Sequence, residues 1–119
     1  MRYNHNTVKN AKKVLVIRLA YVINLMMSQG NSVKNIADDT TASYHGLLAV
    51  KNGKANQVSF EHLLTICDRL GVDFTVTLER TNGIHNVSVA FPTYVEMEAM
   101  LQKKHGYKNT QLERSLSHH

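Results

Sequence analysis

The stretch SVKNIADDTTASYHGLLAVKNGK, residues 32–54, decides the fold of this chain. It predicts a short helix, a tight turn and a second short helix. Ser32 is a good N-cap for the first helix, because its hydroxyl can accept a hydrogen bond from a free N–H group of the first turn. Ile36 and Ala37 give that helix its apolar side. Residues 39–41, Asp-Thr-Thr, then break the helical pattern with side chains that favour turns.

The second helix of the stretch begins after Ser43, which is a further capping residue. Leu47 and Val50 lie three residues apart and are expected to form its buried side. Gly53 ends the helix, since glycine accepts the left-handed backbone that is common just after a helix. Gly46 stands in the middle of the helix, at a cost of about 1 kcal/mol relative to Ala. Close approach of the backbone to a ligand and simple packing both explain Gly46, and the sequence leaves both open.

The spacing of these residues resembles the helix-turn-helix of the lambda-repressor-like family of DNA-binding regulators, also called the XRE or Cro-type family. In that family an Ala on the first helix is followed, at fixed distances, by a turn residue, a small apolar residue, a Ser cap, two aliphatic residues and an Asn-Gly-Lys ending. Counted from Ala37, these positions hold Thr41, Ala42, Ser43, Leu47, Val50 and Asn52-Gly53-Lys54. With the helix that follows, the resemblance covers roughly Leu19 to Val72. It implies double-stranded DNA as the partner.

Three positions depart from the family pattern. Val33 stands where the family usually places a Gln that contacts a backbone phosphate, so the resemblance implies no such contact there. Thr41 replaces the usual turn Gly, and Lys51 replaces a common Glu and adds positive charge. The alternative interpretation is that the stretch forms a small helical hairpin unrelated to this family, because Ser and Gly are common at the helix ends of such structures.

The resemblance also implies which residues meet DNA. Exposed residues near the start of the second helix would enter the major groove, where side chains can distinguish all four base pairs. Mapped onto this chain, the base-reading residues are Ser43, Tyr44, His45 and Leu48. The phosphate-binding residues are Lys34, Lys51, Asn52 and Lys54. Phosphate contacts set the position of a protein on the duplex without reading sequence, and a solvated surface charge is the alternative for each lysine.

The composition is that of one globular domain, with at most a short appendage. The chain has 119 residues, of which 43% are apolar and 19% charged, and its formal net charge is +5. Positive charge suits an anionic partner, although charge alone does not identify one. The single cysteine, Cys67, cannot form an internal disulfide and fits a buried thiol in a reducing compartment. We expect a cytoplasmic protein, bacterial or phage-encoded and nucleoid-associated, without a secretory leader.

A long helix is predicted ahead of the quoted stretch. Residues 1–6 are expected to form a loose arm, and Thr7 to cap a helix that runs to about Ser28. Its apolar residues recur at helical spacing: Val8, Ala11, Leu15, Leu19, Val22, Ile23 and Met26. The β-branched run at residues 14–17 also fits a strand, but the helical spacing continues beyond it. The lysines of the first half, with Arg18, either meet phosphates or form a solvated basic face.

The residues after the stretch predict another helix and then a β-hairpin. Ser59 begins a helix with the sequence SFEHLLTICDRLG, which Gly71 is placed to end. Residues 74–79 alternate apolar and polar side chains, and residues 84–91 are rich in β-branched ones. The Asn-Gly pair at 82–83 is the strongest short-range hairpin signal, because both residues accept positive φ. A lone hairpin is marginal in water, so its partner is either its own helical core or the same hairpin of a second subunit.

A last helix is predicted from Thr93, after Pro92 ends the strand, to about Lys104. Its expected apolar residues are Val95, Met97, Met100 and Leu101. The chain is therefore expected to contain a helix-turn-helix domain over residues 1–72, a dimerisation appendage over 73–105 and a frayed polar tail over 106–119. The expected dimer contacts are Phe74, Val76, Leu78, Val87 and Val89. Whether the final His pair is native stays open.

The expected fold is mainly α: a four-helix lambda-repressor-like domain, followed by a β-hairpin and a C-terminal helix. A short reading helix specifies only a few base pairs, so we expect a dimeric repressor that binds an inverted-repeat operator through the helix Ser43–Lys51. The alternative is a helix-turn-helix antitoxin, which binds a toxin protein and autoregulates its operon. RNA binding is less favoured, because the sequence has no aromatic stacking platform. No metal-ligand spacing, phosphate loop or nucleophile motif is present, so neither catalysis nor a cofactor is expected.

Overall fold

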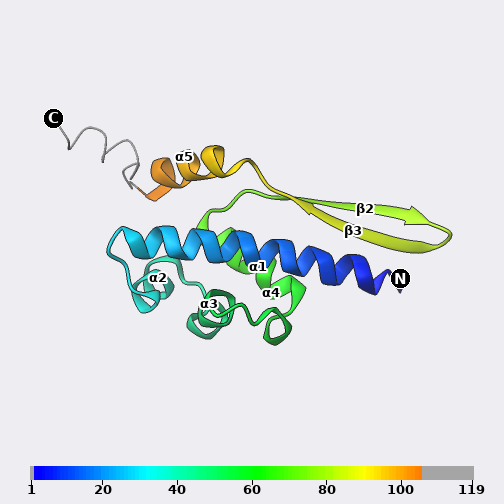
Figure 1. Cartoon of the computed structure of the whole chain (residues 1–119), viewed down its shortest axis with the longest axis horizontal. Coiled ribbons are helices and arrows are strands. Elements are labelled where there is room, and N and C mark those ends of the chain that lie inside the picture. Colours follow the sequence, from blue (N-terminus) through cyan, green and yellow to red (C-terminus); the bar gives the residue numbers. More distant parts are fainter. Residues whose placement is uncertain (1, 106–119) are drawn as a thin grey trace.

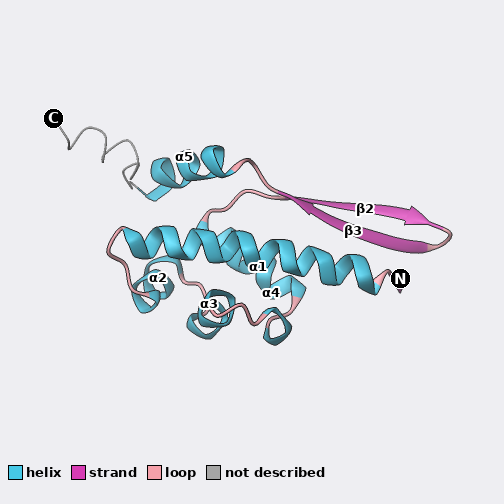
Figure 2. Cartoon of the chain, in the orientation of Figure 1, coloured by secondary structure: helices cyan, strands magenta, loops and turns pink. Residues whose placement is uncertain are grey.

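The computed structural model describes residues 2–105, and Figures 1 and 2 show this part of the chain as a helical protein with one small sheet. The helices are α1 (His5–Ser28), α2 (Val33–Thr40), α3 (Tyr44–Lys51), α4 (Phe60–Leu70) and α5 (Tyr94–His105), with a 3₁₀ turn, η1 (Ala55–Gln57). The strands are β1 (Arg2–Tyr3), β2 (Thr75–Thr81) and β3 (Ile84–Ala90), in the sheet order β1-β3-β2. The predicted fold class is confirmed.

The central element of the fold is α1. Figure 1 shows it between two layers, with α2, α3 and α4 on one side and the hairpin and α5 on the other. Apolar residues at helical spacing fill the core along its length: Ala11, Leu15, Val16, Leu19, Val22, Ile23 and Met26. The alternative prediction of a strand at the β-branched residues 14–17 is therefore wrong.

The N-terminal residues are ordered by contacts with the hairpin, so the loose arm expected for them is wrong over residues 2–6. Arg2 and Tyr3 pair in parallel with β3. The backbone N–H of Asn4 donates to the carbonyl of His85 (2.8 Å), and the Asn4 side chain caps α1 by accepting from the N–H of Asn6 (3.0 Å). A strand of two residues is too short to show alternation, which is why the sequence does not reveal it.

Thr7, the predicted cap of α1, lies in the first turn of the helix and has a different role. Its hydroxyl donates to the carbonyl of Asn4 (2.8 Å) and accepts the N–H of Val87 (3.0 Å). The second bond joins α1 to the middle of β3, 80 residues later in the chain. Thr7 therefore fixes the position of the hairpin along the helix.

The hairpin forms where the sequence predicts it. Asn82 and Gly83 have φ values of 53° and 76°, as a two-residue turn of this kind requires. The pairs Val76–Val89 and Leu78–Val87 lie opposite each other and therefore share one face of the sheet. This face is turned toward the helical layer of the same chain, which is one of the two partners that the sequence left open. Val89 packs against the core, and Val76, Leu78 and Val87 line an apolar pocket together with Phe60 and Leu64 of α4.

The last helix begins as predicted, because the Thr93 hydroxyl accepts the N–H of Glu96 (3.2 Å). Met97 and Leu101 are buried in the same core cluster as the helices of the N-terminal half. Val95, expected on the apolar side, is instead 79% exposed. The reason is helical geometry: Met97 and Leu101 are four residues apart and define the buried side, whereas Val95 is displaced from Met97 by about 200° around the axis.

Arg18 holds the connection between β3 and α5 against α1. Its guanidinium donates to the carbonyl of Pro92 (2.6 Å) and lies 3.9 Å from the centre of the Tyr94 ring. The Phe91 ring is also near, at 5.1 Å, and the edge of Tyr21 meets Tyr94 at 4.8 Å between ring centres. A cation against an aromatic face is stabilised by the ring quadrupole. Arg18 therefore belongs to the packing of the fold and not to a basic surface.

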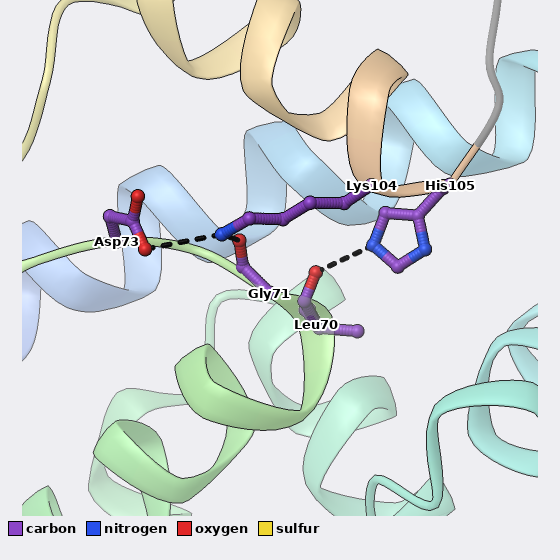
Figure 3. A network of polar contacts seen from close by, with 5 residues as sticks. All are labelled: Leu70, Gly71, Asp73, Lys104 and His105. Atoms are coloured by element: carbon purple, nitrogen blue, oxygen red, sulfur yellow. Dashed lines mark hydrogen bonds and ion pairs between the residues drawn. The ribbon is translucent and has the colours of Figure 1, made fainter.

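The C-terminal end of α5 is attached to the C-terminal end of α4 (Figure 3). The Lys104 ammonium donates to the carbonyl of Gly71 (2.8 Å) and pairs with Asp73 (3.2 Å), and His105 Nε2 lies 2.8 Å from the carbonyl oxygen of Leu70. These side chains satisfy carbonyls that the end of α4 leaves free. An exposed ion pair is worth at most about 1 kcal/mol, so the burial of Leu101 contributes more to holding α5 in place.

Cys67 is buried in α4, as the sequence suggests. Burial away from water disfavours the thiolate and raises the pKa of the thiol to about 12, with a smaller effect from the neighbouring Asp68 carboxylate. A thiol in this state is a small apolar core residue. No helix among residues 2–105 is long and apolar enough to cross a membrane. The polar tail predicted for residues 106–119 lies outside the described residues.

Candidate nucleic-acid interface

The two helices of the quoted stretch are capped as predicted. The Ser32 hydroxyl accepts the N–H of Asn35 (3.1 Å) at the start of α2, and the Ser43 hydroxyl accepts the N–H of Gly46 (3.2 Å) at the start of α3. The first helix extends through Thr40, so the turn between the helices is tighter than the sequence indicates. These caps fix where α3 begins and therefore which side of it faces the core.

Thr41 ends α2 with a left-handed backbone, at φ 60°. A β-branched residue in this region is strained, because its Cβ crowds the backbone. Thr41→Gly is therefore expected to raise the free energy of unfolding by about 1 kcal/mol in denaturant titrations. Thr41→Ala keeps the Cβ and serves as the control, with an expected change within about 0.5 kcal/mol. A Gly variant less stable than the wild type would contradict this account.

One side of α3 is buried and the other faces solvent. Leu47 and Val50 are fully buried, and α3 packs against α1, α2 and α4. On the opposite side Tyr44 is 43% exposed, His45 is exposed beside it, and their ring centres lie 5.7 Å apart. A short helix held in this way presents its N-terminal side chains outward, which is the arrangement needed to enter a major groove.

The other two predicted base-reading residues are placed less openly. Ser43 is half-buried and its hydroxyl is used for capping. Leu48 is also half-buried and packs against the core. Tyr44 and His45 are therefore the members of the predicted set whose polar atoms are best placed to meet base edges.

Gly46 is explained by packing within the protein. It is buried, and a Cβ added to it would lie 3.1 Å from Ile66 Cδ1 and 3.2 Å from His62 Nε2, both on α4. Glycine thus allows α3 and α4 to approach closely. Of the two explanations that the sequence left open, close approach to a ligand is not supported, because Gly46 faces α4.

The predicted phosphate-binding residues lie at both ends of the helix-turn-helix and are all exposed. Lys34 is in the first turn of α2, whereas Lys51, Asn52 and Lys54 follow one another at the end of α3. The single ion pair among residues 2–105 joins Lys104 to Asp73, so none of these lysines is neutralised by a carboxylate of the described chain. Val33 is buried in the core, which accounts for the departure from the family pattern at that position.

A surface that the sequence does not identify as functional continues from α3 through η1. The predicted loop at residues 55–58 contains this short turn, which contacts both α3 and α1. Its residues Asn56 and Gln57 are exposed next to Lys54. A turn of three residues is too short to give a periodic pattern, so the sequence does not predict η1. Its place between α3 and α1 is known only from its contacts with these two helices.

Residues 23–75 match the family model of a Cro/C1-type helix-turn-helix DNA-binding domain. No curated protein and no solved structure matches the chain. The matched residues include the last part of α1 and all of α2, α3 and α4. The resemblance expected over roughly Leu19 to Val72 is therefore confirmed. Residues 23–75 of this chain are a Cro/C1-type helix-turn-helix DNA-binding domain of the lambda-repressor-like family.

Proposed function

We propose that this DNA-binding regulator is a sequence-specific repressor that reads double-stranded DNA through α3 and acts as a dimer on an inverted-repeat operator. The observation that carries the proposal is the orientation of α3 within a Cro/C1-type domain: Leu47 and Val50 lie in the core, while Tyr44 and His45 face solvent. Both exposed side chains can donate or accept hydrogen bonds at base edges. The family is a non-enzymatic class of regulators.

The lysines around α3 support binding along the duplex. Lys34 stands at the start of α2, and Lys51 and Lys54 stand at the other end of the motif. Cations on two sides of a reading helix can hold two stretches of phosphate backbone and so set the register of the helix in the groove. We propose Asn52 as a further backbone contact.

The dimer is proposed to form through the hairpin. A helix of eight residues reads only a few base pairs, so two copies on half-sites about 34 Å apart would provide the specificity. Phe74, Val76, Val87 and Val89 are all at least partly buried in their own chain. Leu78 differs, being 52% exposed on the outer strand of the sheet. Such an unpaired apolar edge is a template for pairing with another chain.

The first test is selection of bound duplexes from a random pool, with sequencing of those retained. An enriched inverted repeat supports a dimeric, sequence-specific regulator. Absence of enrichment, together with binding that vanishes at moderate salt, would mean that only the net charge binds DNA. The antitoxin alternative depends on a segment that folds on a toxin, for which the sequence suggests residues 106–119, and these lie outside the described residues.

Lys54→Gln is expected to weaken binding to all sequences alike, because a phosphate contact is blind to sequence. The dependence of log K on log salt should become shallower by about one unit, as one fewer counterion is released. Affinities measured between low and moderate salt check this result. Lys103→Gln is the matched control, since Lys103 is exposed on α5, and its slope should equal that of the wild type. An unchanged slope in the Lys54 variant would refute the assignment.

Leu78→Lys is expected to convert the dimer to a monomer, because it places a charge at the centre of the proposed contact. Sedimentation at several protein concentrations measures the change. Val95→Lys introduces the same charge at a more exposed position on α5 and should leave the dimer intact. A dimeric Leu78 variant would rule out this contact. Deleting the chain from Phe74 onward is a poor substitute, because it also removes Met97 and Leu101 from the core.

A further inference from the structure

The first half of α1 carries a set of positive charges that the fold does not compensate. Lys9, Lys12 and Lys13, here called the lysine stripe, lie in this half, and α1 contains no Asp or Glu along its whole length. None of the three forms an ion pair with another described residue. The stripe therefore adds little to stability and is available to an external anion.

The stripe is on the side of α1 that faces away from the hairpin. At about 100° per residue, its three lysines fall within about 60° of Val16 around the helix axis. The residues of α1 that bond to β3 or its connection to α5, or that line the pocket beside β3, lie about 120–180° from Val16: Thr7, Asn10, Ala11, Val14 and Arg18. Val8, which lines a second pocket with Val76, Leu78 and Val87, lies about 80° from Val16. Val16 itself is buried. Figure 1 shows the hairpin on one side of α1 and the helix-turn-helix layer on the other. The stripe is turned away from Thr7 and Arg18, which bond to β3 and to its connection with α5.

The end of the reading helix is connected to α1 through the turn η1. The turn η1 follows Lys54 directly and contacts both α3 and α1. Its exposed residues Asn56 and Gln57 offer amide donors between the two sets of lysines. The turn η1 thus connects the end of α3, near Lys51 and Lys54, with α1. Lys9 and Lys13 are one turn apart on the same side of the helix, about 6 Å along the axis.

We propose that the lysine stripe binds the phosphate backbone of DNA outside the half-site that α3 reads. The inference rests on the proposed function, because α3 must be in the groove for α1 to lie along the flanking duplex. The stripe would then increase affinity and footprint length without changing base preference. Its contribution depends on DNA beyond the half-site and is absent on a duplex that ends there.

The test uses the full chain and the duplex enriched in the selection, made in two lengths: the bare operator and the operator with ten flanking base pairs at each end. The wild type should bind the flanked duplex more tightly and with a steeper salt dependence. Lys9→Gln/Lys13→Gln should keep the affinity for the bare operator but lose most of the gain from the flanks. Its salt slope on the flanked duplex should become shallower by about two units.

The matched control is Arg69→Gln/Lys103→Gln, which has the same net charge but removes exposed cations from the last turns of α4 and α5. It should behave as the wild type on both duplexes. A lysine-stripe variant that keeps the full flank effect, or that loses affinity equally on both duplexes, overturns the inference while the proposed function stands. A wild type that does not prefer the selected duplex to a scrambled one overturns the proposed function, and the inference with it.

Discussion

Tyr44→Ala is expected to weaken binding to the selected operator by about 5–150-fold, corresponding to about 1–3 kcal/mol, and to relax base preference at one position of each half-site. Tyr44 is the first residue of α3 and is 43% exposed, next to His45. Its hydroxyl can therefore reach a base edge while the buried side of α3 stays in place. His45→Ala is expected to have an effect of the same size at a neighbouring position.

The measurement compares each variant on the operator, on operators changed at single positions and on random duplex. Tyr44→Phe is the matched control, because it removes the hydroxyl and keeps the ring. Loss of preference in both Phe and Ala variants would assign the readout to the hydroxyl, whereas loss in the Ala variant alone would assign it to the ring. An equal loss on operator and random DNA would place Tyr44 against the backbone and contradict base reading.

Leu101→Ala is expected to lower the free energy of unfolding by about 2–5 kcal/mol, which is a large part of the stability of a domain of this size. Leu101 is fully buried, in a core cluster that includes residues of α1, α2, α3 and α4. The substitution removes apolar contacts and leaves a cavity between α5 and the rest of the core. Unfolding in urea, followed by circular dichroism, measures the change.

Val95→Ala is the control for Leu101, since Val95 lies in the same helix but is 79% exposed. Its effect should stay within about 0.5 kcal/mol. Both variants should unfold in a single transition, because the described residues share one core. A separate early transition in the Leu101 variant would mean instead that α5 is an independent appendage.

The sequence predicts well those parts of the fold that depend on residues close to one another in the chain. Ser32, Ser43 and Ser59 each cap a helix as expected, because a hydroxyl and the N–H group it accepts from are three residues apart. The hairpin turn at Asn82 and Gly83 is equally local, since it follows from the φ values that these residues accept. The residues proposed to meet DNA could be named from the sequence for the same reason, because they lie close together in the chain, in α2, α3 and the residues around them.

The residues proposed as dimer contacts show what such local signals do not predict. Alternation correctly places Val76, Leu78, Val87 and Val89 on one face of the hairpin. A period of two shows that a face is apolar but not what covers it. Val87 is buried and Val76 and Val89 are partly buried in their own chain, whereas Leu78 is 52% exposed and lines a pocket beside Phe60 and Leu64.

Local chemistry in the sequence thus predicted the five helices, the caps of α2, α3, α4 and α5 and the hairpin turn, and the resemblance of residues 37–54 to a known family predicted the DNA-binding motif. The three-dimensional packing settled the pairing of β1 with β3, the place of Arg18 between α1 and Tyr94, and the need for glycine at Gly46. Each of these depends on residues that are far apart in the chain, up to 82 positions for Arg2 and Ile84. A sequence shows which chemical groups the two residues of such a contact carry. The distance between these residues in space is set only when the whole core is packed.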